Sequence, residues 1–244
     1  MSDLTIIIQG NITQECFNFY LEHYKNYKII ISTWEGYSLS KENGGDFNCM
    51  ESKFKYKPKI IVSKSIECGH QNFTCQVVST LNALKEVKTK YVIKIRGDEY
   101  YSNIKYLYDL IKKNKNKIIS SPIFFRKWLH SRFHISDHII GGVSKNVKLM
   151  LQSSYDIIFL KEKNCDINSF TPQVSEQKLT YWYLKKKEPI INDTNEIDIC
   201  KKHFKIFNID LMKPYLVTSN CFKTKWYDNF VPEEWDSIKS LNEL

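Results

Sequence analysis

Arginine is scarce in this basic chain. Arg96, Arg126 and Arg132 are the only arginines among the 36 Lys and Arg residues behind the formal net charge of +9. Guanidinium groups are the side chains best suited to read bases and to grip phosphates with paired hydrogen bonds. Their scarcity argues against a nucleic-acid-binding protein, and runs such as Lys185–Lys187 are interpreted as solvated faces. No nucleic-acid partner is therefore expected.

Long apolar runs are also missing. The longest, such as residues 6–8 and 29–31, fall far short of the ~18 residues that a membrane-spanning helix needs. The N-terminal residues lack the basic region and apolar core of a secretory signal. The sequence therefore predicts a cytoplasmic protein without a transmembrane segment. A peripheral contact with a membrane and the oligomeric state are left open.

The seven cysteines include no C-x-x-C pair, which disfavours a structural zinc site. They also lack the density of a small disulfide-bonded secreted scaffold. Reduced thiols are expected, and Cys16, Cys75 and Cys221 are expected to be buried as small apolar side chains.

Several common catalytic motifs are absent. The residues after the first apolar run, Gln9-Gly10-Asn11, match neither G-x-G-x-x-G nor a P-loop, and G-x-S-x-G does not occur. These absences disfavour dinucleotide oxidoreductases, P-loop nucleotidases and α/β-hydrolases.

What the chain does contain is an alternation of short β-branched runs with helical patterns. We expect strands over 5–10, 28–34, 59–63, 91–95 and 118–125, and helices after Asn11 and over 72–87 and 103–113. The less regular second half predicts helices over 147–152 and 176–186 and strands over 204–209 and 215–218. This order predicts one α/β domain over residues 1–244, with a mostly parallel central sheet and helices on both faces.

Polar residues follow several of the predicted strands, and ligands of open α/β sheets bind at the carboxyl ends of strands. Asp98 and Glu99 follow one strand directly. Carboxylates there are suited to Mg²⁺ or Mn²⁺, which prefer oxygen ligands and bridge phosphates, and Arg96 is placed to neutralise the same phosphates. The alternative is an acidic turn leading into a helix, whose N-terminus favours Asp and Glu.

Two further carboxylates are candidates for the site. Asp137 lies between His134 and His138, a set that suits a metal, but the two histidines would share a face only on a helix. The β-branched neighbours and the following Gly-Gly disfavour a helix, so polar residues on a strand or loop are the alternative. Glu176 begins a predicted helix, where glutamates are common because of the helix dipole.

Motifs in a fixed order resemble the WavE-type lipopolysaccharide-synthesis family over roughly residues 5–185. They are Gln9-Gly10, Ile31–Trp34, Gln71-Asn72 with Gln76–Leu84, Tyr91–Glu99, Ser136-Asp137-His138 and Glu176-Gln177. The resemblance implies a GT-A-like nucleotide-sugar-binding fold and a glycosyltransferase, either a hexosyltransferase or a related sugar transferase. The donor would be a nucleotide-diphospho-sugar and the acceptor a glycan, a lipid-linked or a protein-linked group.

The resemblance also implies a division of roles. Residues 1–125 would form the donor-binding half and residues 126–244 the acceptor-binding half. Asp98 and Glu99 would hold Mn²⁺ or Mg²⁺, and either Glu176 or Asp137 would take the proton from the acceptor hydroxyl in an inverting reaction. The expected donor-binding residues are Gln9, Gly10, Thr33, Trp34, Asn72, Gln76 and Arg96.

The chain departs from the family pattern at two positions. Cys75 stands where the family has Arg, and Arg96 stands in place of the first acid of a D-x-D metal motif. The second departure favours an alternative function, a catalytically degenerate GT-A-like module that binds a glycan or an anionic surface.

Overall fold

The computed structural model describes residues 3–35, 53–67, 72–122, 132–160, 172–188, 190–192, 194–218 and 223–226. The strands of the main sheet are β1 (Leu4–Gln9), β2 (Lys28–Trp34), β3 (Lys59–Ser63), β4 (Tyr91–Arg96), β6 (Ile118–Ser120), β7 (Ile140–Val143) and β8 (Phe204–Ile206). A small sheet contains β5 (Tyr100–Tyr101), β9 (Tyr215–Thr218) and β10 (Lys223–Trp226). The helices are α1 (Gln14–His23), α3 (Phe73–Glu86), α4 (Ile104–Lys113), α5 (Ser144–Leu160), α6 (Ser175–Lys187), α7 (Glu196–His203) and the short η2 (Ile209–Met212).

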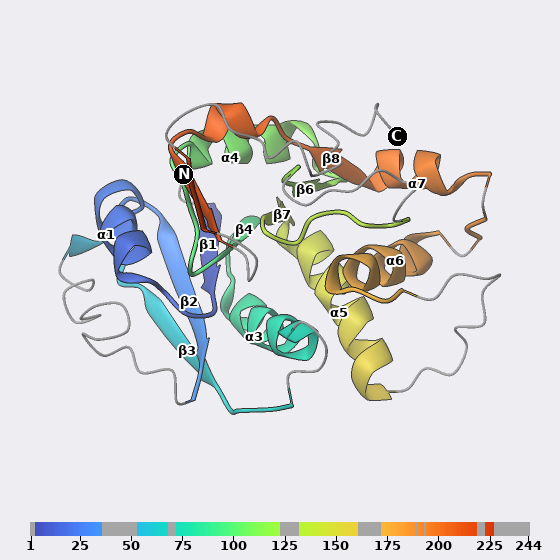
Figure 1. The fold of residues 1–244 in the computed structure, drawn as a ribbon, viewed down its shortest axis with the longest axis horizontal. Helices are drawn as coiled ribbons and strands as arrows, with labels where there is room; N and C mark the ends of the chain where they lie inside the picture. The colour runs from blue at the N-terminus through green and yellow to red at the C-terminus, as the bar shows by residue number, and fades with distance from the viewer. Residues whose placement is uncertain are drawn as a thin grey trace.

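The main sheet has the strand order β3-β2-β1-β4-β7-β6-β8 (Figure 1). Its pairings are parallel except at β7, which runs antiparallel to both β4 and β6. The predicted α/β fold with a mostly parallel sheet is therefore confirmed. The strands β7 and β8, from the second half of the chain, lie in the same sheet as β1–β4; the assignment of donor and acceptor halves stays a prediction.

Helices cover both faces of the sheet because successive strand residues point to opposite sides. Ile6 and Ile8 belong to an apolar cluster with side chains of α1 and α4. Ile7, between them, belongs to a second cluster with side chains of α3, α5 and α6. This alternation buries the central strands β1, β2 and β4 on both faces, whereas the edge strand β3 leaves Ile60 and Val62 exposed.

The structure corrects several predicted boundaries. Thr13, not Asn11, caps the first helix, since its hydroxyl accepts a hydrogen bond from the Cys16 amide. The helix expected over 147–152 extends over Ser144–Leu160. The strand expected over 118–125 ends at Ser120, and residues 123–130 lie outside the described residues. In the part of the chain that the structure describes, each helix is too short or too polar to span a bilayer.

The cysteines follow the expectation only in part. Cys16 and Cys200 are buried free thiols, whereas Cys75 is disulfide-bonded. The expectation of a reduced thiol is therefore wrong for Cys75, because pairing depends on which cysteines the fold brings within reach and not on a C-x-x-C spacing. Cys75 is nevertheless buried, as predicted; Cys221 lies outside the described residues. The cytoplasmic location stays a prediction.

Candidate active site

The strand register places three of the predicted polar segments side by side. Gln9, the last residue of β1, pairs with Ser32 of β2 and with Arg96 of β4. The Gly10 amide donates a hydrogen bond to the Ser32 carbonyl, and the Gly97 amide donates one to the Gln9 carbonyl. Both hydrogen bonds are 2.8 Å long. The carboxyl ends of β1, β2 and β4 therefore form one edge held together by main-chain hydrogen bonds.

Two glycines allow this edge to form. Gly10 has a φ of 95°, a conformation that side-chain-bearing residues rarely adopt. Gly97 lies so close to the chain after β1 that a Cβ atom there would overlap the Asn11 carbonyl oxygen. The turn after β4 thus packs main chain against main chain with the turn after β1.

Thr33 carries the clearest unsatisfied group at this edge. Its side chain is buried at the end of β2, and its hydroxyl has no hydrogen-bond partner among the described residues. A buried hydroxyl without a partner is unfavourable, and native structures seldom leave one without a reason. Trp34 beside it is also buried, whereas Asn72 is exposed, has a left-handed backbone (φ 58°) and does not cap α3 with its side chain.

Arg96 and Asp98 form a two-pronged ion pair on the turn after β4. Arg96 Nε donates a hydrogen bond of 3.0 Å to Asp98 Oδ1, and Arg96 Nη2 donates one of 2.9 Å to Asp98 Oδ2. Arg96 Nε also lies 3.3 Å from Glu99 Oε1. Burial alone would lower the pKa of Arg96, but the carboxylates of Glu99 and Asp98 hold it above its usual value. The guanidinium is therefore charged and shared between the two acids.

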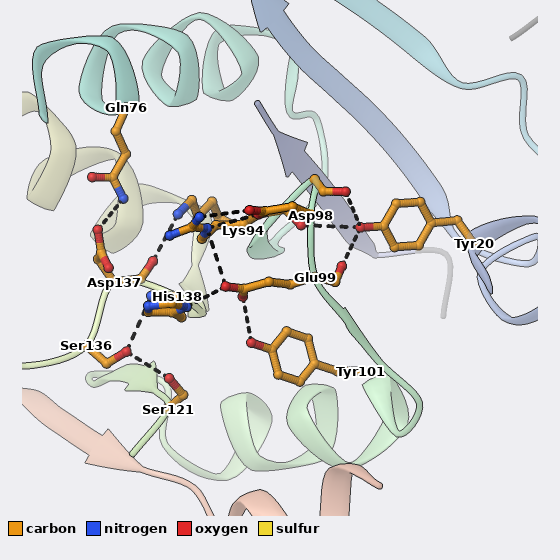
Figure 2. Close-up of polar contacts among 12 residues, drawn as sticks. Tyr20, Gln76, Lys94, Asp98, Glu99, Tyr101, Ser121, Ser136, Asp137 and His138 are labelled. Carbon is orange, nitrogen blue, oxygen red and sulfur yellow. Dashed lines mark hydrogen bonds and ion pairs between the residues drawn. The ribbon is translucent and has the colours of Figure 1, made fainter. Parts of the chain in front are cut away.

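Glu99 is fully buried and is the centre of a polar network (Figure 2). Its Oε2 accepts a hydrogen bond of 2.7 Å from the Tyr101 hydroxyl, and its Oε1 lies 2.5 Å from His138 Nδ1. Its main-chain carbonyl accepts from the hydroxyl of Tyr20, which comes from α1. Glu99 thus joins β4, β5, α1 and the segment before β7.

The two acids do not fit a divalent cation as they are arranged. A cation needs carboxylate oxygens as ligands, but both Asp98 oxygens accept from Arg96, and both Glu99 oxygens are engaged by Tyr101, His138 and Arg96. No group of three or more His, Cys, Asp or Glu side chains suited to a metal occurs within the described ranges. A metal at Asp98 would have to share this carboxylate with Arg96.

Asp137 connects three elements. Its Oδ2 accepts a hydrogen bond of 2.6 Å from Gln76 Nε2 of α3, and its carbonyl oxygen accepts one of 2.9 Å from Lys94 Nζ of β4. Burial raises the pKa of the Asp137 carboxyl, but the charges of Lys94 and His138 and the Gln76 hydrogen bond outweigh burial and hold it below its usual value. The structure therefore brings the predicted Gln76 and Asp137 together, with an ionised carboxylate.

Glu176 lies in the first turn of α6, and its side chain is 18% exposed. Its Oε2 is 3.8 Å from His134 Nε2. The neighbouring Gln177 fixes this helix start: its Oε1 accepts from the amides of Gln173 and Val174, and its Nε2 donates to the Arg132 carbonyl. The Gln177 amide is therefore used to anchor α6 next to the segment 132–138.

The segment 132–138 is not helical, which agrees with the prediction from the sequence. It connects the two candidate carboxylates with the Glu99 network. His134 faces Glu176, Asp137 contacts Gln76 and Lys94, and His138 contacts Glu99. Ser136, between them, hydrogen-bonds with Ser121 across a distance of 2.9 Å. The segment begins at Phe133, whose φ of 58° is unusual for an aromatic residue.

Sequence reasoning missed Lys94, Tyr101 and the pairing of Glu99 with His138. A signal existed for Lys94, since a lysine between Ile93 and Ile95 in a strand buried on both faces must place an ammonium in the core. No local pattern indicated the other contacts, because Glu99 and His138 are 39 positions apart in the chain.

An open, mostly parallel α/β sheet with helices on both faces places the chain in the doubly wound α/β class. Within this class the family is defined by sequence. Residues 5–199 match the family model described as WavE lipopolysaccharide synthesis, and the chain belongs to that family. The resemblance seen in its motifs is confirmed.

Solved structures to which the chain is similar include the glycosyltransferase GlyE of Streptococcus pneumoniae TIGR4, with a TM-score of 0.47 and 10% identity over 85% of this chain and 45% of GlyE. The apo form of GlyE gives a TM-score of 0.47 and 12% identity over 76% of this chain and 44% of GlyE. The chain thus spans less than half the length of these proteins. No curated protein matches the sequence.

Proposed function

We propose that the protein is a glycosyltransferase that moves a sugar from a nucleotide-diphospho-sugar to a glycan, a lipid-linked or a protein-linked acceptor. Membership of a lipopolysaccharide-synthesis family supports sugar chemistry. The observation that carries the proposal is the polar edge at the ends of β1, β2 and β4, where the buried Thr33 hydroxyl has no partner among the described residues. A bound nucleotide would supply that partner.

The proposed roles combine the family resemblance with the positions of the residues in the fold. Gln9, Gly10, Thr33 and Trp34 would contact the nucleotide, and Arg96 would face the diphosphate with Asp98 fixing its orientation. Glu176 would take the proton from the acceptor hydroxyl, since it is a partly exposed carboxylate at a helix start. Asp137, held by Gln76, would bind substrate hydroxyls and not transfer the proton.

The first prediction tests the donor site through Thr33. Thr33→Val removes only a hydroxyl, so we expect unchanged or higher stability but about three- to tenfold weaker binding of UDP or GDP, the value of one hydrogen bond. Isothermal titration calorimetry measures this affinity. Thr180→Val is the matched control, because Thr180 in α6 is also a buried hydroxyl without a partner among the described residues. Equal losses in both variants would remove Thr33 from the donor site.

The second prediction concerns Mn²⁺ or Mg²⁺. A cation at Asp98 and Glu99 remains a proposal of the family resemblance, and the arrangement of the two acids does not favour it. We therefore expect UDP or GDP to bind with equal affinity, within about twofold or ~0.4 kcal/mol, in Mn²⁺ and in EDTA. Tighter binding in Mn²⁺ that is lost in Asp98→Asn would instead establish a metal site at Asp98.

A second candidate function is a degenerate module that binds a glycan or an anionic surface without transfer. Arg96 favours it, because an arginine occupies the position of the first acid and pairs with both remaining acids. The two functions differ in one result. The transferase releases nucleoside diphosphate in the presence of donor and acceptor, whereas the module binds a glycan or anionic vesicles and releases none.

A further inference from the structure

Lys94 is an unusual residue for the middle of a central strand. It is 1% exposed, and its register neighbours are Ile7 of β1 and Ile140 of β7. Both isoleucines belong to the apolar cluster beneath α3 and α5. Burial accordingly lowers the pKa of the Lys94 ammonium. A buried lysine is unfavourable unless it is paired, and a methionine or leucine would pack there without that cost.

The contacts of Lys94 all lead to Asp137. Nζ donates to the Asp137 carbonyl oxygen at a distance of 2.9 Å, and within the described residues this is its one hydrogen bond. Among the nearby charges, Asp137 acts most strongly on Lys94, ahead of Arg96, Glu99 and Asp98. Figure 2 shows Lys94 and Gln76 on either side of Asp137. The carboxylate is thus fixed by an amide from α3, while an ammonium from β4 holds its main chain.

We propose that Lys94 is a positioning residue that holds the main chain and the charge of Asp137 in place for substrate binding. This inference rests on the proposed function, because substrate binding by Asp137 is part of that proposal. Lys94 does not touch substrate: it is buried beneath Asp137, and Asp137 itself is partly exposed.

A double-mutant cycle tests the coupling between the Lys94 ammonium and the Asp137 carboxylate without any assay of transfer. The variants are Lys94→Met, Asp137→Asn and the double variant, each unfolded with urea. Each single change removes one of the two charges and leaves the other without it, so the double variant should lose less than the sum of the two single losses. Additive losses would overturn the proposal. If Lys94→Met does not fold, Lys94→Gln, which keeps a donor and removes the charge, completes the same cycle.

Steady-state kinetics test the positioning role. Lys94→Met should raise the KM for donor or acceptor about tenfold, the effect of losing a hydrogen bond to a charged group, with a smaller change in kcat. The same change made in Asp137→Asn should raise KM by a smaller factor, because only the main-chain hydrogen bond then remains to be lost. Lys90→Met is the matched control, an exposed lysine just before the same strand, and should leave KM unchanged.

The two experiments separate the inference from the function on which it rests. A lower kcat with an unchanged KM in Lys94→Met, or an equal rise in KM in the Asp137→Asn background, would overturn the positioning role. If the native protein transfers no sugar at all, the proposed function fails, and the urea cycle still decides whether Lys94 and Asp137 act as one unit.

Discussion

Glu176→Gln is expected to lower kcat about 10²–10⁴-fold with little change in donor affinity. The variant keeps the shape of the side chain and removes its ability to accept a proton. The first turn of α6 stabilises the charged carboxylate, and Gln177 anchors that turn to the segment 132–138. The proposed proton acceptor therefore lies on a helix start that hydrogen bonds hold in place.

The comparison with Asp137→Asn makes the test specific. Asp137→Asn should raise the KM of donor or acceptor more than it lowers kcat, because the role proposed for that carboxylate, which Gln76 holds in place, is binding. Glu188→Gln is the control at the opposite end of α6 and should retain kcat. The reverse pattern would exchange the roles of Glu176 and Asp137, and full kcat in both would show that the catalytic base lies elsewhere.

Glu99→Ala is expected to lower the free energy of unfolding by about 3–5 kcal/mol. The change leaves the Tyr101 hydroxyl, the His138 ring and the Arg96 guanidinium without their shared acceptor in the core. Asp98→Asn is the matched comparison, because that side chain is 29% exposed and its ion pair should be worth about 1 kcal/mol or less. Urea unfolding followed by circular dichroism measures both values.

Equal losses of unfolding free energy in these two variants would contradict the distinction between the two acids. Glu99 would then not be the acid that supports the fold while Asp98 lies partly exposed at the polar edge. A loss below about 1 kcal/mol for Glu99→Ala would show that the Glu99 network is not required for stability. Its carboxylate would then be available for another task.

The sequence predicts the regular parallel strands better than the irregular ones. Runs such as Ile6–Ile8 and Ile29–Ile31 indicate buried strands because only a sheet covered on both faces accommodates them. The two-residue β5 and the antiparallel β7 were not foreseen. Their positions depend on long-range pairing, and β7 contains Gly141-Gly142, which a local reading takes as the end of a strand.

The candidate site shows the same division. The rule for strand ends identifies Gln9, Thr33 and Arg96, because it needs only the boundaries of β1, β2 and β4. It does not indicate that Arg96 closes on Asp98, or that Lys94 reaches Asp137 across 43 positions of the chain. Such contacts depend on how side chains pack in three dimensions, and hydrophobic periodicity along the sequence does not report that packing.

The contact of Gly97 with the Asn11 carbonyl has a consequence for substrate choice. The donor edge is framed by peptide groups of β1, β2 and β4, and these are the same whatever side chains surround them. Related chains that keep a glycine at this turn inherit the frame unchanged. If the proposed function holds, differences in the sugar or base that they accept come from side chains at these strand ends, such as Thr33 and Trp34. Exchange of those side chains between relatives is a direct route to altered donor specificity.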